Sequence, residues 1–376
     1  MAVSFCCFLL GDCKKEFTPK LNQTDVSILV VEGYIDGADT VLLKLSRARK
    51  IYPGDSAVSK NELHARISIE DDQHNTYPIV EIGNGVYKSS MVLNLNPAYQ
   101  YRLHFFTSDN KEYVSDFVPY KVSRPIDSIG WDIKNDGLQL YVNTQDPTNN
   151  TRYYRWEYTE TWEFNSQWES GIMYDPTTRS IVPRTEQVHT CWRSQNSTNI
   201  LLGSTTTLSN DVVNKAPIEF FPYHDEKLDI IYSTLVKQYA LDLAGYNFWQ
   251  QMKENTEITG SIFDPQPGLI SGNIHCVTDP SQKTIGYIGA GATFQKRIFI
   301  ISSSLPSDWV QRIFCGDSVW ILPPQDYHVL FGPPGSFLDP VEPIVSGGNI
   351  IGYVGASPIC VDCTLTGTNK KPSYWP

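Results

Sequence analysis

One stretch, residues 227–300, most constrains the fold, because it holds the only convincing helix of an otherwise strand-rich sequence. Asp242 suits an N-cap, since its carboxylate can accept hydrogen bonds from the free N–H groups of a first helical turn. Apolar side chains then recur at helical spacing, with Phe248 and Trp249 among them. We therefore expect one short aromatic helix, near residues 242–255, that packs against a sheet.

The composition bounds the class of protein. The chain has 376 residues, which is long for a single domain, and 41% of them are hydrophobic, which is enough for packed cores. The net charge is −11, from 30 Lys and Arg against 41 Asp and Glu. This balance argues against nucleic-acid binding by phosphate neutralisation and against docking on anionic lipid. No apolar run approaches the roughly 20 residues that a spanning helix needs.

Residues 26–122 alternate strand-like runs with turns and show no helical pattern. Ala65, Ile67 and Ile69 share one strand face, and the segment 83–85, Gly-Asn-Gly, marks a hairpin turn. About seven such strands at short regular spacing are typical of an immunoglobulin-like sandwich. The sequence therefore predicts an immunoglobulin-like β-sandwich over residues 26–122.

A second strand series begins after a linker-like segment, so residues 123–376 are expected to form a second, fibronectin-III-like β-sandwich that carries the helix and long loops. Its run 153–164 alternates well, which predicts a core face with Tyr154, Trp156 and Tyr158. For the opposite face, a solvated surface is favoured over a carboxylate pair for acid–base chemistry. That opposite face carries Arg155, Glu157, Thr159, Thr161 and Glu163.

Three tryptophans in or near the polar excursion 168–199 are candidates for ligand contact, because aromatic rings can stack sugars or grip extended peptides. They are Trp162, Trp168 and Trp192. The alternative for each is packing in the core or at an interface.

The start of the chain is expected to be a secretory signal peptide, residues 1–12, whose missing basic region indicates a truncated start. Cys13 follows in a setting that resembles a bacterial lipobox and would carry lipid. Residues 13–25 would then form a polar tether. Several acyl chains would anchor the protein firmly, since one chain alone binds a bilayer only marginally.

Five further cysteines are candidates for disulfides, which an exported protein can form. They are Cys191, Cys276, Cys315, Cys360 and Cys363. The C-x-x-C spacing at 360–363 also invites a zinc or redox site, but a second cysteine pair and a βαβ setting are both missing. Disulfides that fix the C-terminal tail are favoured, and their connectivity is not set by the sequence.

Catalytic and cofactor motifs are absent, so we expect no enzymatic activity and no cofactor. There is no Gly-x-Ser-x-Gly elbow, no His-Glu-x-x-His helix and no Walker loop. The glycine-rich segment 286–291 lies within a strand-like run, which favours a bulge or close packing over phosphate binding. A surface hydrolase of unfamiliar design remains a less favoured alternative.

Four hydroxyl residues follow an aspartate and precede a small or apolar residue, a pattern that resembles the O-glycosylation sequon of exported Bacteroidetes proteins. They are Thr40, Ser56, Ser128 and Ser318. The pattern is short, so we expect one or two of the four to be modified.

The chain resembles the Bacteroidetes outer-membrane lipoproteins grouped as domain of unknown function 4249. The segments that carry the resemblance include 13–16, 30–35, 154–158, 246–249, 263–267, 272–274, 286–287, 296–300 and 360–375. They occur in order over nearly the whole chain. The resemblance implies an outer-membrane address and a TonB-dependent transporter as partner, and it transfers no catalytic residue.

The expected function is therefore that of a non-enzymatic, lipid-anchored accessory protein on the outer membrane that captures a ligand for a TonB-dependent transporter or caps the transporter. The alternative is a structural or assembly subunit of an outer-membrane complex that binds no small molecule.

Overall fold

The computed structural model describes residues 28–48, 60–257, 270, 272–309, 315–322, 326–332 and 337–376. Within these residues strands predominate, and the longest helix is α1 (Leu243–Glu257). The prediction of a mainly β fold with a helix near residues 242–255 is confirmed. Asp242 accepts a hydrogen bond from the Gly245 amide at 2.8 Å, as expected of an N-cap.

Eight strands of the largest sheet close into a ring, because β7 pairs with both β4 and β9 and so joins the two ends of the pairing order. In that order the ring consists of β7 (Gln100–Phe106), β4 (Arg66–Asp71), β5 (Thr76–Gly83), β6 (Val86–Lys88), β2 (Leu42–Ala48), β1 (Ile28–Asp36), β21 (Ala290–Ala292) and β9 (Val118–Val122). Four strands attach to it, namely β3 (Lys60–Asn61), β8 (Glu112–Ser115), β19 (Ile274–Cys276) and β20 (Thr284–Ile285).

The immunoglobulin-like sandwich predicted for residues 26–122 is not confirmed. A sandwich has two separate sheets, whereas the pairing here runs continuously around the ring. The ring is completed by β21, which follows α1 in the chain and lies outside the predicted boundaries. Its parallel pairing covers the edges of β1 and β9, which would otherwise expose unpaired backbone groups. Phe248 of α1 joins the core inside the ring, so the helix packs against a sheet as expected.

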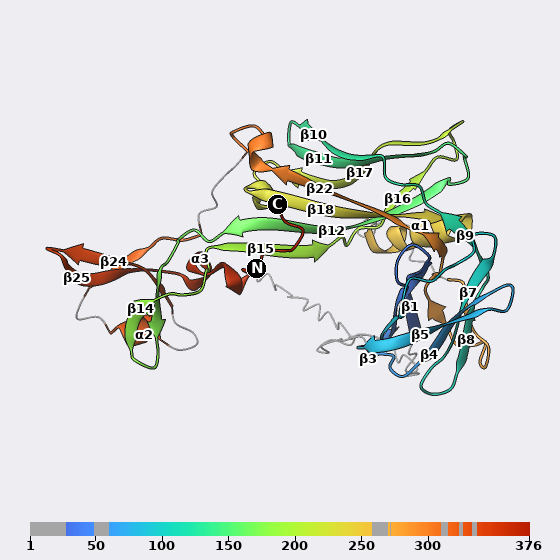
Figure 1. Cartoon of the computed structure of the whole chain (residues 1–376), viewed down its shortest axis with the longest axis horizontal. Helices are drawn as coiled ribbons and strands as arrows, with labels where there is room; N and C mark the ends of the chain where they lie inside the picture. Colours follow the sequence, from blue (N-terminus) through green and yellow to red (C-terminus); the bar gives the residue numbers. More distant parts are fainter. Residues whose placement is uncertain are drawn as a thin grey trace, which may run out of the picture.

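A long sheet and a three-stranded sheet share a second core. The long sheet consists of β15 (Thr190–Asn196), β16 (Leu201–Ser204), β12 (Tyr153–Asn165), β18 (Ile231–Leu241) and β22 (Phe294–Ile301). The other consists of β10 (Ser128–Lys134), β11 (Gly137–Asp146) and β17 (Asp211–Pro222). Because α1 and ring strands interrupt this unit in the chain, the fibronectin-III-like domain is not confirmed either. Figure 1 shows α1 where the long sheet meets the ring.

The two faces of β12 differ from the prediction in one respect. Tyr154, Trp156 and Tyr158 lie in the core as expected. On the opposite face, however, Arg155 and Thr161 are also buried. Arg155 is covered by α1, and the Thr161 hydroxyl lies 2.9 Å from the hydroxyl of Tyr374 in the C-terminal segment. Elements far away in the sequence therefore cover a face that alternation alone marks as solvated.

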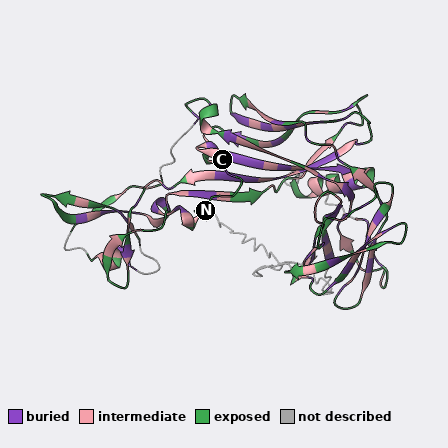
Figure 2. Ribbon diagram, in the orientation of Figure 1, coloured by how far each residue is buried: buried purple, intermediate pink, exposed green. Residues whose placement is uncertain are grey.

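A smaller unit, here called the distal lobe, stands at the end of the molecule away from the ring (Figure 1). Its elements are β13 (Ile172–Asp175), β14 (Ser180–Pro183), β23 (Val319–Ile321), α2 (Tyr327–Phe331), β24 (Asp339–Ser346) and β25 (Asn349–Ala356). Tyr174, Ile321 and Phe331 form a small buried cluster inside it. Figure 2 shows the outer part of the β24–β25 hairpin as mainly exposed.

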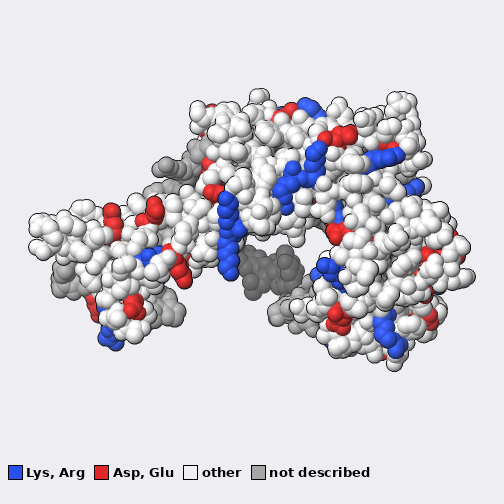
Figure 3. Space-filling view, in the orientation of Figure 1, with Lys and Arg blue, Asp and Glu red and all other residues white. Residues whose placement is uncertain are grey.

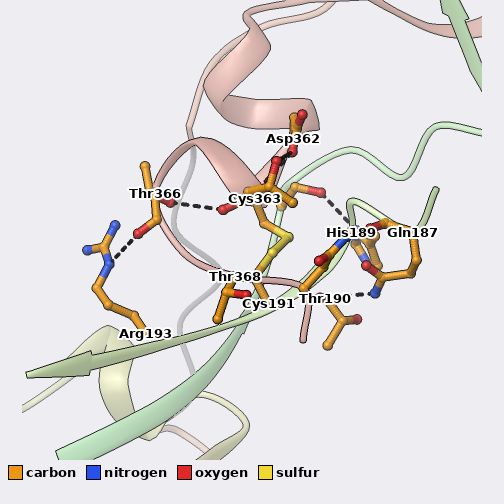
Figure 4. The surroundings of a disulfide bond; sticks show 12 residues. Gln187, His189, Thr190, Cys191, Arg193, Asp362, Cys363, Thr366 and Thr368 are labelled. Atoms are coloured by element: carbon orange, nitrogen blue, oxygen red, sulfur yellow. Dashed lines mark hydrogen bonds between the residues drawn. A yellow bond between two sulfur atoms is a disulfide. The ribbon is translucent and has the colours of Figure 1, made fainter. Parts of the chain in front are cut away.

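The C-terminal segment returns from the lobe to the long sheet through two short helices, α3 (Pro358–Val361) and η3 (Cys363–Leu365). A disulfide joins Cys363 to Cys191 on β15, and Arg193 Nε donates to the carbonyl of Thr366 at 2.8 Å (Figure 4). A second disulfide joins Cys315 to Cys360. The two cysteines of the C-x-x-C segment thus bind different partners. Cys276 is buried and keeps an unpaired thiol.

Candidate functional site

The three tryptophans predicted to contact ligand do not form a surface. Trp162 is 2% exposed and Trp192 is 8% exposed, and both pack in the interior. Trp168 is half-buried against a small apolar cluster beneath the distal lobe. Both therefore follow the alternative of packing in the interior, because Trp162 joins the second core and the C-terminal segment pairs with Trp192. Their contact with a ligand stays a prediction.

The residues predicted to be modified are only partly described. Thr40 is half-buried and its hydroxyl donates to Asp39, while Ser128 is exposed and its hydroxyl accepts from Asn143 at 2.9 Å. Ser318 is half-buried next to β23. Cys13 and Ser56 lie outside the described residues. Glycosylation and lipidation stay predictions.

An open cleft with a volume of about 550 Å³ lies between the ring and the long sheet. Strands β1 and β2 and the segment 285–287 form its ring side, and β12, β18 and α1 form its other side. Figure 3 shows the molecule hollowed between these two units, with charges of both signs near the hollow. Apolar side chains such as Leu42 and Met252 line the cleft beside several paired charges.

Arg155 of β12 is a buried charge of the cleft, at 9% exposure. Its guanidinium lies between two aromatic faces, 4.0 Å from the ring centroid of Trp249 and 4.4 Å from that of Tyr239. Each such contact contributes about 0.5–2 kcal/mol, depending on desolvation. Arg155 Nη1 also lies 2.8 Å from Glu157 Oε1, while its buried Nε has no hydrogen-bond partner among the described residues.

Two further pairs of polar groups lie in the cleft. The hydroxyl of Tyr239 donates to Glu157 Oε2 at 2.6 Å. Burial, and then the nearby charge of Glu157, raises the pKa of Tyr239 far above its usual value, so the phenol stays protonated. Lys237 Nζ of the long sheet lies 3.1 Å from Asp36 Oδ2 of the ring. This ion pair joins the two walls of the cleft.

Close backbone packing explains the glycine-rich segment beside the cleft. Gly286 has a φ of +147°, and a Cβ atom there would lie 2.2 Å from the carbonyl oxygen of Val31. A side chain would therefore force β20 away from β1. The interpretation of close packing at this segment is confirmed.

Sequence reasoning did not find Arg155 as a site residue, because it was assigned to a solvated face. A signal was nevertheless present. Four of the segments that carry the family resemblance, 30–35, 154–158, 246–249 and 286–287, meet at the cleft and supply part of its lining. They come from both units and from α1, so their proximity depends on the tertiary fold.

The arrangement can bind a ligand of mixed polarity, since an apolar lining with a few fixed polar groups is the usual composition of a small-molecule site. Among the described residues, no group of three His, Cys, Asp or Glu side chains could hold a metal ion. No helix in that part of the chain is long and apolar enough to cross a membrane.

Comparison with known proteins gives a family. No curated protein matches the chain. A family model described as a domain of unknown function, DUF4249, matches residues 14–297, which cover the ring, α1, all but the end of the long sheet and the cleft between them. The match spans well over half of the sequence, and the chain therefore belongs to the DUF4249 family.

Proposed function

We propose that this chain is a non-enzymatic lipoprotein of the outer membrane, anchored through Cys13, that captures a ligand for a TonB-dependent transporter. The observation that carries the proposal is the cleft of about 550 Å³ between the ring and the long sheet. Its volume and its mainly apolar lining are typical of sites for small molecules. Two walls from different units also allow a ligand to be held from both sides.

The side chains of the cleft favour binding over catalysis. Arg155 and Lys237 are each paired with a carboxylate, and the phenol of Tyr239 is kept protonated by burial. A nucleophile or general base needs a reactive group with an available lone pair and a partner that activates it. Fixed charge pairs and stacked rings supply shape and polarity instead, which orient a bound molecule.

The two disulfides support an exported protein, because disulfides persist in oxidising compartments outside the cytosol. The outer-membrane address and the transporter partner come from the sequence resemblance and from the lipobox-like setting of Cys13.

Native mass spectrometry of the protein purified from its own membranes tests ligand capture. Leu42 is half-exposed and lines the cleft, so Leu42→Arg should fill it without disturbing the core. Val80→Arg is the matched control, since Val80 is equally exposed on β5 and does not line the cleft. We expect a non-protein adduct on the wild type and on Val80→Arg. In Leu42→Arg the affinity for this ligand should fall at least about tenfold, which corresponds to a change of about 1.4 kcal/mol in the free energy of binding. Equal adducts on all three proteins, or none on the wild type, would contradict ligand capture.

Membrane fractionation and a detergent pull-down test the address and the partner. The wild type should sediment with the outer membrane, and Cys13→Ala should be released from it. A tagged copy in mild detergent should recover a TonB-dependent transporter. Retention of Cys13→Ala in the membrane would argue against the lipid anchor, and a pull-down without a transporter would argue against the partner.

A structural or assembly subunit is the second candidate function, and the exposed apolar surface of the distal lobe favours it. If this second function is correct, Leu42→Arg should recover the partner as well as the wild type does, and no variant should carry a ligand adduct.

A further inference from the structure

The part of the distal lobe after residue 312 has an unusual charge composition, whereas Arg179 and Arg184 lie in or next to its β13–β14 hairpin. Residues 313–369 contain no Lys or Arg, although they include the carboxylates Asp317, Asp326, Asp339, Glu342 and Asp362. The strands β23, β24 and β25 all fall in this stretch and beyond residue 297, where the match to the family model ends. The lobe sheet therefore lies outside the residues that the family model matches, and its only formal charges are negative.

The β24–β25 hairpin ends in a tight turn that carries apolar side chains. Ser346 pairs with Asn349 across Gly347 and Gly348, whose φ values of +57° and +81° are those of a two-residue hairpin loop of type I′. Directly behind the turn, Val345 pairs with Ile350, and each is 58% exposed. A turn of this kind fixes the pairing at the tip, behind which the register shifts between Ile344 and Val345, so the apolar tip is preformed.

More exposed apolar side chains extend the surface along the same sheet. Ile351 follows the tip on β25, and Trp320 on β23 is 73% exposed. In Figure 3 the end of the lobe that carries β24 and β25 is almost entirely white apart from a few red atoms. Exposed apolar side chains gathered in one place are uncommon on soluble proteins unless they bind a partner.

The outer strand disfavours recognition by strand addition. β24 lies at the edge of its sheet and contains Pro340 and Pro343, which lack backbone N–H donors. Prolines on an edge strand prevent another chain from extending the sheet. The contacts of a partner must therefore come from the side chains of the tip.

We propose that the β24–β25 tip is a docking surface for a partner protein that offers an apolar groove bordered by Lys or Arg. The apolar groove would cover Val345, Ile350 and Ile351, and the basic border would face the carboxylate of Glu342, which is exposed on β24. Complementary charge at the rim guides encounter and register, while the buried apolar centre supplies most of the affinity.

A protein partner fits this surface better than a lipid bilayer. Anionic headgroups attract Lys and Arg, of which residues 313–369 have none, and they repel carboxylates. The inference is independent of whether the cleft holds a ligand, because the tip and the cleft share no lining residue.

A photo-crosslinking amino acid placed at Ile350 in the full-length protein, in its native membrane, tests the proposal. The matched control position is Ile82, which is also a β-branched residue of similar exposure, on β5 of the ring. We expect one protein adduct from position 350, with a yield at least about tenfold above the yield from position 82. The cross-linked peptide of the partner should be apolar and flanked by Lys or Arg.

Surface variants then test the chemistry of the contact. Val345→Thr with Ile350→Thr keeps the β-branched shape and removes two apolar groups, and Val80→Thr with Ile82→Thr is its control on β5. With the crosslinker at Ile351, the adduct yield should fall at least about tenfold in the tip variant and several-fold in Glu342→Lys. The control variant should give the same yield as the wild type. Unchanged thermal unfolding should verify that the tip variant folds.

Three results would overturn the proposal. The first is equal adducts from positions 350 and 82, and the second is an adduct with a second copy of this chain. The third is flotation of a Cys13→Ser protein with vesicles of phosphatidylethanolamine and phosphatidylglycerol, if the tip substitutions abolish that flotation. The last result would assign the tip to a membrane. None of them changes the ligand adduct of the cleft, so the two proposals can fail separately.

Discussion

The carboxylate of Asp146 accepts hydrogen bonds from Arg124 Nε at 3.0 Å, from Thr148 Oγ1 at 2.6 Å and from the Thr151 amide at 3.0 Å. Burial alone would raise the pKa of Asp146, but the hydrogen bonds, those from Thr148 first, outweigh it and hold the pKa far below its usual value. The side chain thus fixes both the turn after β11 and the linker at Arg124.

The lowered pKa of Asp146 predicts how the stability of the protein depends on pH. The pKa of Asp146 is lower in the folded protein than in the unfolded chain. The ionised carboxylate therefore contributes fully to the free energy of unfolding above the unfolded pKa of about 3.9, and this contribution is lost as the pH falls below that value. Asp146→Asn should therefore lower the free energy of unfolding at pH 7 by about 1–3 kcal/mol, and the gap to the wild type should narrow as the pH falls below about 4. Urea unfolding at pH 7, 5 and 3 measures this.

The control for Asp146→Asn is Asp175→Asn, which changes a half-buried carboxylate at the end of β13 that accepts from the Thr177 amide. It should alter stability far less. A gap between Asp146→Asn and the wild type that stays constant from pH 7 to pH 3 would show that the charge of Asp146 is not responsible.

At the residue scale, local patterns were predictable and long-range contacts were not. Asp242 was expected to cap α1 and does so, because capping depends on neighbours a few positions away. Arg155 was assigned to a solvated face, since nothing near it in the sequence shows that Trp249 will cover it. Trp162 and Trp192 were candidates for ligand contact with interior packing as the alternative, and both lie inside.

At the element scale, the C-terminal helices depend on disulfides whose pairing was not set by the sequence. Cys360 and Cys363 are three positions apart, and they join Cys315 and Cys191 respectively. Spacing alone left zinc, redox and structural roles open. The two cysteines bind different partners, so one disulfide joins α3 to Cys315 and the other holds η3 against β15.

Peptide mapping without reduction tests the disulfide pairing. It should recover Cys191–Cys363 and Cys315–Cys360, and a peptide that joins Cys360 to Cys363 would contradict the structure. Replacing both members of a pair by Ser should cost about 2–5 kcal/mol of unfolding free energy. The loss should be larger for Cys191–Cys363, which closes a loop of 172 residues against 45 for the other pair, since the entropy of loop closure grows with length.

At the scale of the whole molecule, the chain leaves the ring and later returns to it. Strands β1 to β9 build most of the ring, the chain then forms the second unit and α1, and β19 to β21 complete the ring before β22 rejoins the long sheet. The mainly β class was predictable from alternation. The return was not, because β20 and β21 have two and three residues and pair in parallel over a long separation, which leaves little local pattern.

This return predicts that residues 28–122 do not fold alone. Without β21 the edges of β1 and β9 are open, and without Phe248 and Ile288 the ring core loses two buried apolar side chains. The isolated fragment should therefore aggregate and show no cooperative transition in circular dichroism, because open edges pair with other chains. A fusion of residues 28–122 to residues 242–293 through a flexible Gly-Ser linker should restore a single cooperative transition. Cooperative unfolding of the fragment alone, with the fusion no more stable, would show that the ring does not need these strands and that residues 26–122 are an independent domain.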